Sequence, residues 1–171
     1  MPVQAIVYSS NTGFTAQYAA MLGRKTELPV YTLAEAAQKL QKGARIVYMS
    51  WLMAGTLVDY KKASKLFDVA AVCSVGLNAT QAQADKTRKS SGVPVHVPLF
   101  PLQGGYDESK LTGMYRFMMK LVAKMLINQI SAKSDKTAED ERMLETLRHG
   151  GSYVQAENLI GIADWLESSA H

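Results

Sequence analysis

Short runs of hydrophobic residues alternate with amphipathic segments along the first hundred positions. The apolar runs have the length of strands buried on both faces, at 3–7, 28–31, 45–50, 69–73 and 93–100. The segments between them have helical patterns, at 14–24, 32–42, 59–67 and 79–91. Strands that alternate with helices need crossover connections, which produce a parallel sheet covered on both faces. The pattern therefore predicts an α/β, doubly wound sandwich.

The prolines suggest which strands lie at the edges of this sheet. Pro29 falls in the second apolar run, and Pro94 and Pro98 fall in the fifth. Because proline has no N–H to donate, strands that contain it belong at sheet edges. We therefore predict a five-stranded parallel sheet in the order 2-1-3-4-5. A ligand is expected at the carboxyl ends of the first and third strands, where the strand order reverses.

The C-terminal third has a different pattern. Residues 111–130 are apolar over most of a helical circumference and contain no acid, and their polar residues recur every four positions, at Arg116, Lys120, Lys124 and Asn128. One interpretation is a last crossover helix, buried against the sheet with a solvated basic stripe. The other is an exposed surface for a membrane or an apolar redox partner.

Two further helices are expected near the C-terminus. Residues 134–149 form a charged segment with acids near its start and arginines later, which favours a surface helix. The apolar positions within 159–166 have the spacing of a final amphipathic helix.

Composition adds limits to this picture. The 171 residues fit a single domain over 1–171, and 47% are hydrophobic. No apolar run has the length of a bilayer span and no leader pattern precedes the first strand, so we expect a cytoplasmic protein, with peripheral contact at the inner membrane face if 111–130 is exposed. The net charge of +4 allows an anionic partner or surface and does not require nucleic acid. The single Cys73 and three scattered histidines predict no disulfide and no metal site.

The most informative stretch joins the first strand to the first helix. Its hydroxyl-bearing residues Ser10, Thr12 and Thr15 surround Gly13, which allows close backbone approach at the start of a helix. Such a turn is an anion cradle. It matches neither the triphosphate loop nor the dinucleotide fingerprint, and no Lys or Arg occurs between Met1 and Gly23. Neutral donors suit a single bound monophosphate, although an ordinary turn with a helix cap would also favour these residues.

The sequence motif Ser10-x-Thr12-Gly13-x-Thr15 resembles the FMN phosphate loop of flavodoxins, S/T-x-T-G-x-T. The motif follows the first predicted strand, as the phosphate loop does in flavodoxins. The resemblance implies FMN as cofactor. It assigns the phosphate to a contiguous set of residues: Ser10, Asn11, Thr12, Gly13, Phe14 and Thr15.

Two other segments are candidates for contact with the isoalloxazine ring, which needs flat apolar walls and a few backbone hydrogen bonds. The first follows the third strand and comprises Trp51, Leu52, Met53, Ala54 and Gly55. The alternative for Trp51 is a core anchor. The second follows the fourth strand and offers backbone donors to the pyrimidine edge, from Ser74, Val75, Gly76 and Leu77.

Two longer stretches, 73–77 and 114–121, resemble the branch of the flavodoxin family that contains the menaquinone-dependent protoporphyrinogen oxidases. This resemblance covers nearly the whole chain. It implies an FMN oxidoreductase that passes hydride or electrons from a bulky, tetrapyrrole-type substrate to a quinone.

The residues leave a second class open, a flavodoxin-type carrier of single electrons between proteins. The net charge of +4 argues against docking to basic reductases, and no acid lies between Ser50 and Val58, which favours two-electron chemistry. A phosphoacceptor receiver would need clustered acids after the first strand, where Tyr8-Ser9-Ser10 stands instead. No pattern identifies a catalytic acid or base.

Overall fold

The computed structural model describes residues 1–170, which divide into two compact units. The sheet unit consists of Met1–Gly104 together with the C-terminal segment that starts at Val154. The helical unit consists of Gly105–Tyr153. We describe each unit by itself.

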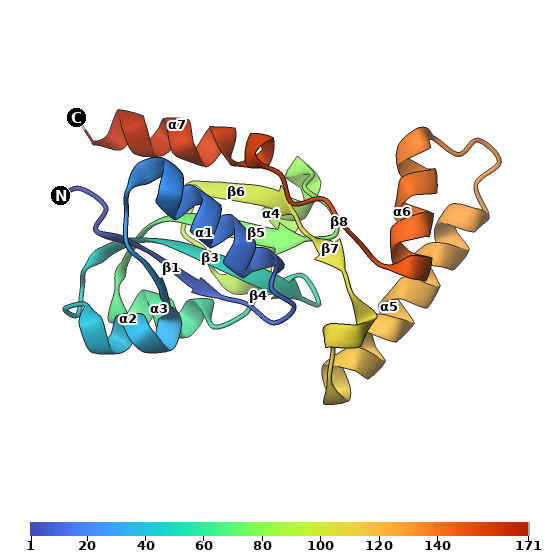
Figure 1. Cartoon of the computed structure of the whole chain (residues 1–171), viewed down its shortest axis with the longest axis horizontal. Coiled ribbons are helices and arrows are strands. Elements are labelled where there is room, and N and C mark those ends of the chain that lie inside the picture. Colours follow the sequence, from blue (N-terminus) through green and yellow to red (C-terminus); the bar gives the residue numbers. More distant parts are fainter. Residues whose placement is uncertain (171) are drawn as a thin grey trace. The chain divides into compact units, whose positions relative to one another are not determined.

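The sheet unit contains six strands that form one sheet (Figure 1). The strands are β1 (Ala5–Ser9), β2 (Val30–Thr32), β3 (Arg45–Met53), β4 (Thr56–Leu57), β5 (Asp68–Gly76) and β6 (Leu99–Gln103). The helices are α1 (Phe14–Thr26), α2 (Leu33–Lys39), α3 (Tyr60–Leu66), α4 (Gln81–Ser91), the 3-10 turn η2 (Ala156–Leu159) and α7 (Ile160–Ser169). The predicted α/β class with a mostly parallel sheet is confirmed.

The strand order differs from the predicted five-stranded 2-1-3-4-5. The parallel strands follow the order β2-β1-β3-β5-β6, and the short β4 adds a sixth strand that pairs antiparallel with β3. A two-residue turn makes this hairpin, with positive φ angles at Ala54 (50°) and Gly55 (79°). Turns of this kind match the twist of the paired strands. The third strand, predicted over 45–50, therefore ends later than expected, because β3 runs on to Met53.

Two other predicted boundaries also need correction. The fourth strand was predicted over 69–73, but β5 continues to Gly76, so most of the segment placed after that strand belongs to it. The fifth strand was expected over 93–100, but β6 begins only at Leu99. The residues before it turn, with Val97 N donating to Pro94 O at 3.1 Å. The strand does contain a proline, Pro101, and β2 and β6 lie at the two edges of the parallel order.

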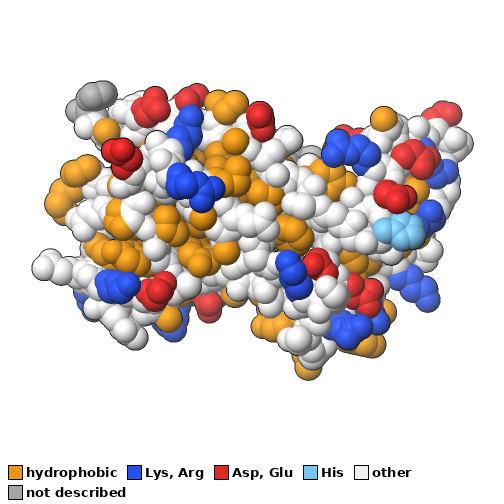
Figure 2. Space-filling view, in the orientation of Figure 1, with side chains coloured by type: hydrophobic (Ala, Val, Ile, Leu, Met, Phe, Trp, Pro, Cys, Tyr) orange, Lys and Arg blue, Asp and Glu red, His pale blue; other side chains and the backbone are white. Residues whose placement is uncertain are grey.

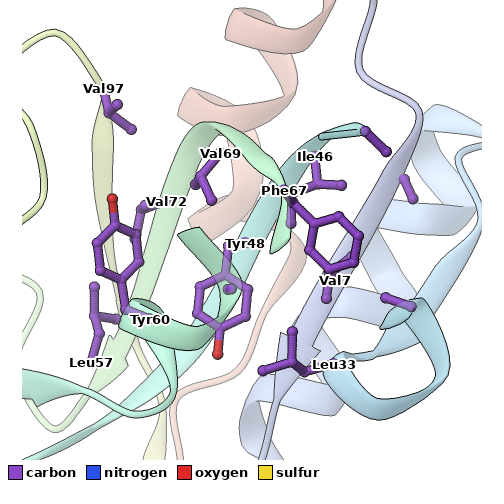
Figure 3. Close-up of a cluster of buried hydrophobic side chains, with 14 of the residues drawn as sticks. Val7, Leu33, Ile46, Tyr48, Leu57, Tyr60, Phe67, Val69, Val72 and Val97 are labelled. Carbon is purple, nitrogen blue, oxygen red and sulfur yellow. The ribbon is translucent and has the colours of Figure 1, made fainter. Parts of the chain in front are cut away.

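Each face of the sheet carries its own hydrophobic cluster because strand residues alternate in direction. Ile46 and Tyr48 pack with residues of α2 and α3 on one face (Figure 3). Val47 and Met49 pack with residues of α1 and α7 on the other face. Helices therefore cover both faces, and the C-terminal segment packs into the core on the same face as α1.

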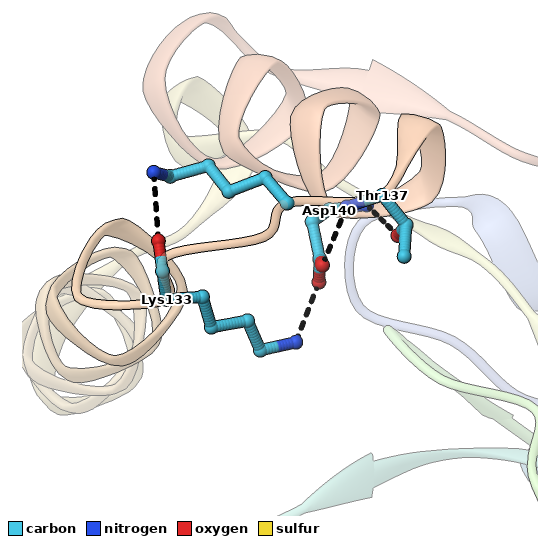
Figure 4. Close-up of polar contacts among 4 residues, drawn as sticks. Lys133, Thr137 and Asp140 are labelled. Carbon is cyan, nitrogen blue, oxygen red and sulfur yellow. Dashed lines mark hydrogen bonds and ion pairs between the residues drawn. The ribbon is translucent and has the colours of Figure 1, made fainter.

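The helical unit contains two short strands and two long helices. Its elements are β7 (Gly105–Tyr106), the 3-10 turn η1 (Glu108–Lys110), α5 (Gly113–Ser131), α6 (Ala138–His149) and β8 (Gly151–Ser152). Helix α6 starts with a capping box, in which Asp140 N donates to Thr137 Oγ1 and Thr137 N donates to Asp140 Oδ2. Lys133 Nζ lies 2.8 Å from Asp140 Oδ1 (Figure 4). The ion pair and the cap together fix the connection between α5 and α6.

Helix α5 is mostly exposed, so its interpretation as a buried crossover helix is wrong. Only Ala123 and Ile130 of this helix are buried. Large apolar side chains stand open to solvent (Figure 2), with exposed fractions of 77% at Met114, 64% at Phe117, 55% at Leu121 and 52% at Met125. Among the described residues, no helix combines the length and the apolar character needed to cross a membrane.

Candidate functional site

The register of the three central strands brings the predicted site segments to one edge of the sheet. Ser9 pairs with Ser50, and Ser50 pairs with Ser74, all in parallel strands. One step further, Trp51 pairs with Val75. The carboxyl ends of β1, β3 and β5 therefore lie side by side, and ligands of open α/β sheets bind at this edge.

The turn between β1 and α1 is capped by a side chain from its own start. Ser10 Oγ accepts hydrogen bonds from Gly13 N at 3.2 Å and from Ala16 N at 3.4 Å. The first intrahelical bond runs from Gln17 N to Gly13 O at 3.0 Å. The N–H groups of Phe14 and Thr15 therefore have no acceptor inside the helix. The alternative of a capped turn thus describes part of this structure, and two backbone donors remain for a ligand.

The same turn offers side-chain donors and open space. Within residues 1–170, no hydrogen-bond partner is found for the hydroxyls of Thr12, which is partly exposed, and of Thr15, which is only 1% exposed. Gly13 adopts a φ of 93°, a conformation natural to glycine, and a side chain there would meet no atom within 4 Å. These hydroxyls, the N–H groups and the positive end of the α1 dipole fit an anion. Asn11 is the most exposed residue of the turn.

The wall predicted after the third strand lies at the end of β3 and in the hairpin turn. Trp51 is half-buried, and the two-residue period from Val47 and Met49 places it on the face that α1 covers. Leu52 packs against the opposite cluster. Met53, Ala54 and Gly55 form the tip of the hairpin. Partial exposure of Trp51 near the carboxyl end of β3 is compatible with a ring contact.

Behind the hairpin lies a polar network that sequence reasoning missed. Tyr48 Oη donates to Val58 O at 2.9 Å and lies 2.9 Å from Ser9 Oγ. Ser50 Oγ donates to the same carbonyl at 2.8 Å. Burial raises the pKa of Tyr48 to about 12, so its hydroxyl stays protonated at neutral pH. The network fixes the point at which the hairpin joins α3.

This network also brings a carboxylate to the end of β1. Asp59 Oδ2 lies 3.4 Å from Ser9 Oγ, although the two residues are 50 positions apart. The absence of acids between Ser50 and Val58 therefore does not leave this edge of the sheet without negative charge. No local sequence signal marks the approach of Asp59.

The buried Ser74 and Cys73 point to opposite faces of β5. Ser74 Oγ is the one buried side-chain oxygen or nitrogen without a hydrogen-bond partner in the described part of the chain. Cys73 is fully buried, and burial raises the pKa of its thiol, which keeps it protonated and unreactive. A group of three or more potential metal ligands is not found within residues 1–170.

Comparison with known proteins adds no assignment, because no family model, no curated protein and no solved structure matches the chain. The fold and the site define a class in physical terms. The chain is an α/β protein in which the turn after the first strand carries N–H groups without an intrahelical acceptor, and in which the half-buried Trp51 lies near the carboxyl end of β3.

Proposed function

We propose that the chain is a flavodoxin-like FMN-binding oxidoreductase. The observation that carries the proposal is the turn from Ser10 to Thr15, whose hydroxyls and N–H groups offer several neutral donors to one phosphate. The mostly parallel sheet with helices on both faces is compatible with a doubly wound fold, which supports the flavodoxin-like assignment.

The arrangement favours FMN over a nucleotide triphosphate because no cation stands in the first 23 residues to balance a larger charge. Ser10, Thr12 and Thr15 would donate to the phosphate through their hydroxyls. The ring would contact two groups of residues at the same sheet edge: Trp51, Leu52, Met53, Ala54 and Gly55, and Ser74, Val75, Gly76 and Leu77. When bound, FMN supplies transfer of hydride or of electrons.

The redox chemistry distinguishes an enzyme from a carrier. We favour a two-electron enzyme, resembling the protoporphyrinogen oxidase branch, that passes electrons from a bulky hydrophobic donor to a quinone. The net charge of +4 supports it. The Asp59 carboxylate near Ser9 instead favours the single-electron carrier, because negative charge near a flavin opposes the ionisation of the flavin on reduction. An equilibrium redox titration separates the two functions: one two-electron step supports the enzyme, and two resolved one-electron steps support the carrier.

Trp51→Ala tests the aromatic wall. Stacking on an indole quenches flavin fluorescence, so the variant is expected to recover part of that emission and to bind FMN about 1 kcal/mol more weakly. Emission from bound FMN and its dissociation constant are measured for both proteins. If both values match the wild type, Trp51 has no ring contact and belongs to the core.

The exposed face of α5 is our candidate for peripheral contact with a membrane that holds the quinone. The apolar side chains Met114, Phe117 and Leu121 are accompanied by cations, as in helices that lie in a membrane interface. Part of that charge is already neutralised, because Glu108 Oε1 lies 2.9 Å from Lys120 Nζ and 3.6 Å from Arg116 Nη2. The apolar face therefore has to supply most of the binding.

Vesicle sedimentation tests this contact. The wild type is expected to sediment with anionic vesicles, less so at high salt, and Phe117→Glu is expected to lower the binding about tenfold or more. Val95→Glu is the matched control, since Val95 is 89% exposed and lies outside α5. Equal losses in the two variants, or no sedimentation of the wild type, would contradict the proposal.

A further inference from the structure

The hydroxyl of Tyr18 lies at a junction of three segments that are far apart in the sequence. The Tyr18 side chain is fully buried in α1, one turn after Phe14. Its hydroxyl donates to Gln103 O at the end of β6 and accepts from Asn158 Nδ2 at 2.7 Å. The backbone of Gln155 also hydrogen-bonds to it. This hydroxyl therefore fixes the end of β6 against α1.

Gln103 extends this network to the end of β5. Its side-chain Nε2 donates to Leu77 O at 3.0 Å, and the next residue, Gly104, donates from its N–H to Gly76 O at 2.7 Å. Gln103 and Gly104, at the end of β6, thus hold the carbonyls of Gly76, the last residue of β5, and of Leu77, the residue after it. These two hydrogen bonds fix the position of the backbone at the end of β5.

Gly104 also connects the segment to the start of α1. A Cβ atom at this position would lie 2.8 Å from Val75 Cγ1 and 3.5 Å from Phe14 Cβ. Because a contact of 2.8 Å forces a shift, only glycine fits without moving Val75. The start of α1, the end of β5 and the end of β6 are therefore packed together at the sheet edge that carries the anion-binding turn.

The same residues lie where the chain leaves and re-enters the sheet unit. The chain leaves after Gly104 and returns at Val154. Tyr18 hydrogen-bonds to Gln103 just before the exit and to Gln155 and Asn158 just after the return. One hydroxyl thus ties both junctions to the helix that begins at the anion-binding turn.

We propose that Tyr18 and Gln103 are positioning residues for the flavin ring: Tyr18 fixes Gln103, and the Gln103 amide fixes the Leu77 carbonyl, which holds the backbone of residues 76–78 for the polar edge of the ring. This inference rests on the proposed function. The two residues act on the ring side of the site, whereas Ser10, Thr12 and Thr15 act on the phosphate side.

The test compares FMN with riboflavin, which lacks the phosphate. Gln103→Leu removes the donor to Leu77 O. This variant is expected to bind FMN and riboflavin more weakly by the same factor, about tenfold, and to shift the absorption bands of both bound flavins. Tyr18→Phe is expected to show a smaller loss with the same pattern. Gln81→Leu is the matched control, because Gln81 is exposed and its amide donates to Asp85 within α4.

Gln103→Glu supplies a readout that a purely structural role would not change. The introduced carboxylate cannot donate to Leu77 O, but its protonated form can. The affinity of this variant for both flavins is therefore expected to rise as the pH falls, and that of Gln103→Leu is not. Circular dichroism confirms that each variant is folded at the pH used.

The outcomes separate the two proposals. If the wild type binds FMN but Gln103→Leu and Gln103→Glu bind both flavins as the wild type does, the positioning role is overturned and the proposed function stands. A loss for FMN alone would also overturn the role, because it would place Gln103 at the phosphate. If the wild type binds neither flavin, both proposals fail.

Discussion

Ser10→Asp is expected to lower FMN affinity about 100-fold while the protein stays folded. An aspartate can accept the hydrogen bonds that Ser10 Oγ accepts from Gly13 N and Ala16 N. Its negative charge also suits the start of a helix. The same charge repels a phosphate: at an effective dielectric constant of about 20, two unit charges about 5 Å apart repel by about 3 kcal/mol.

The expected pattern across two flavins makes this variant informative. Titration of the protein with FMN and with riboflavin should show the loss for FMN only, and the melting temperature should equal or exceed that of the wild type. Ser64→Asp, on the exposed surface of α3, is the control for one added negative charge. An equal loss for riboflavin, or unchanged FMN affinity, would contradict a phosphate site at Ser10.

Ile162→Ala is expected to lower the free energy of unfolding by about 2–5 kcal/mol. Ile162 is fully buried in the cluster that α1 and α7 share. Its truncation would leave a cavity in that cluster. Urea unfolding of the purified protein measures the change.

The same helix provides a matched control. Ile160 is 55% exposed, so Ile160→Ala should change the free energy of unfolding by no more than about 0.5 kcal/mol. Similar losses at the two positions would contradict the assignment of the C-terminal segment to the core of the sheet unit.

The fold class was predictable because the information is local. Buried strands such as β3 and β5 are nearly continuous apolar runs, and prolines occur at or beside the edge strands β2 and β6. The hairpin was missed because Ala54 has a positive φ, which alanine rarely adopts. The boundary of β6 was misplaced because Val93 and Val97 pack into the core from a turn rather than from a strand.

The exposure of α5 could not be settled from sequence alone. A helix that is apolar over most of its circumference normally lies in a core. Only the structure shows that Met114 and Phe117 stay open to solvent. The hydrophobic pattern defines the helix, but it does not define the surface that covers it.

Part of the candidate site was predictable from the sequence and part was not. The turn from Ser10 to Thr15 is contiguous, so its donors are visible in the sequence. Asp59 and Gln103 were not predictable, because Asp59 approaches Ser9 across 50 positions and Gln103 meets Tyr18 across 85. The count of acids between Ser50 and Val58 also missed a negative charge at this sheet edge, because Asp59, which lies 3.4 Å from Ser9, is outside that stretch.

The most direct test of the central claim is a fluorescence titration of the purified wild-type protein with FMN and, separately, with riboflavin. We predict saturable quenching with one FMN per chain and a clearly weaker affinity for riboflavin, because only FMN has a phosphate for the turn that begins at Ser10. Absence of saturable FMN binding, or equal affinities for the two flavins, would contradict the claim.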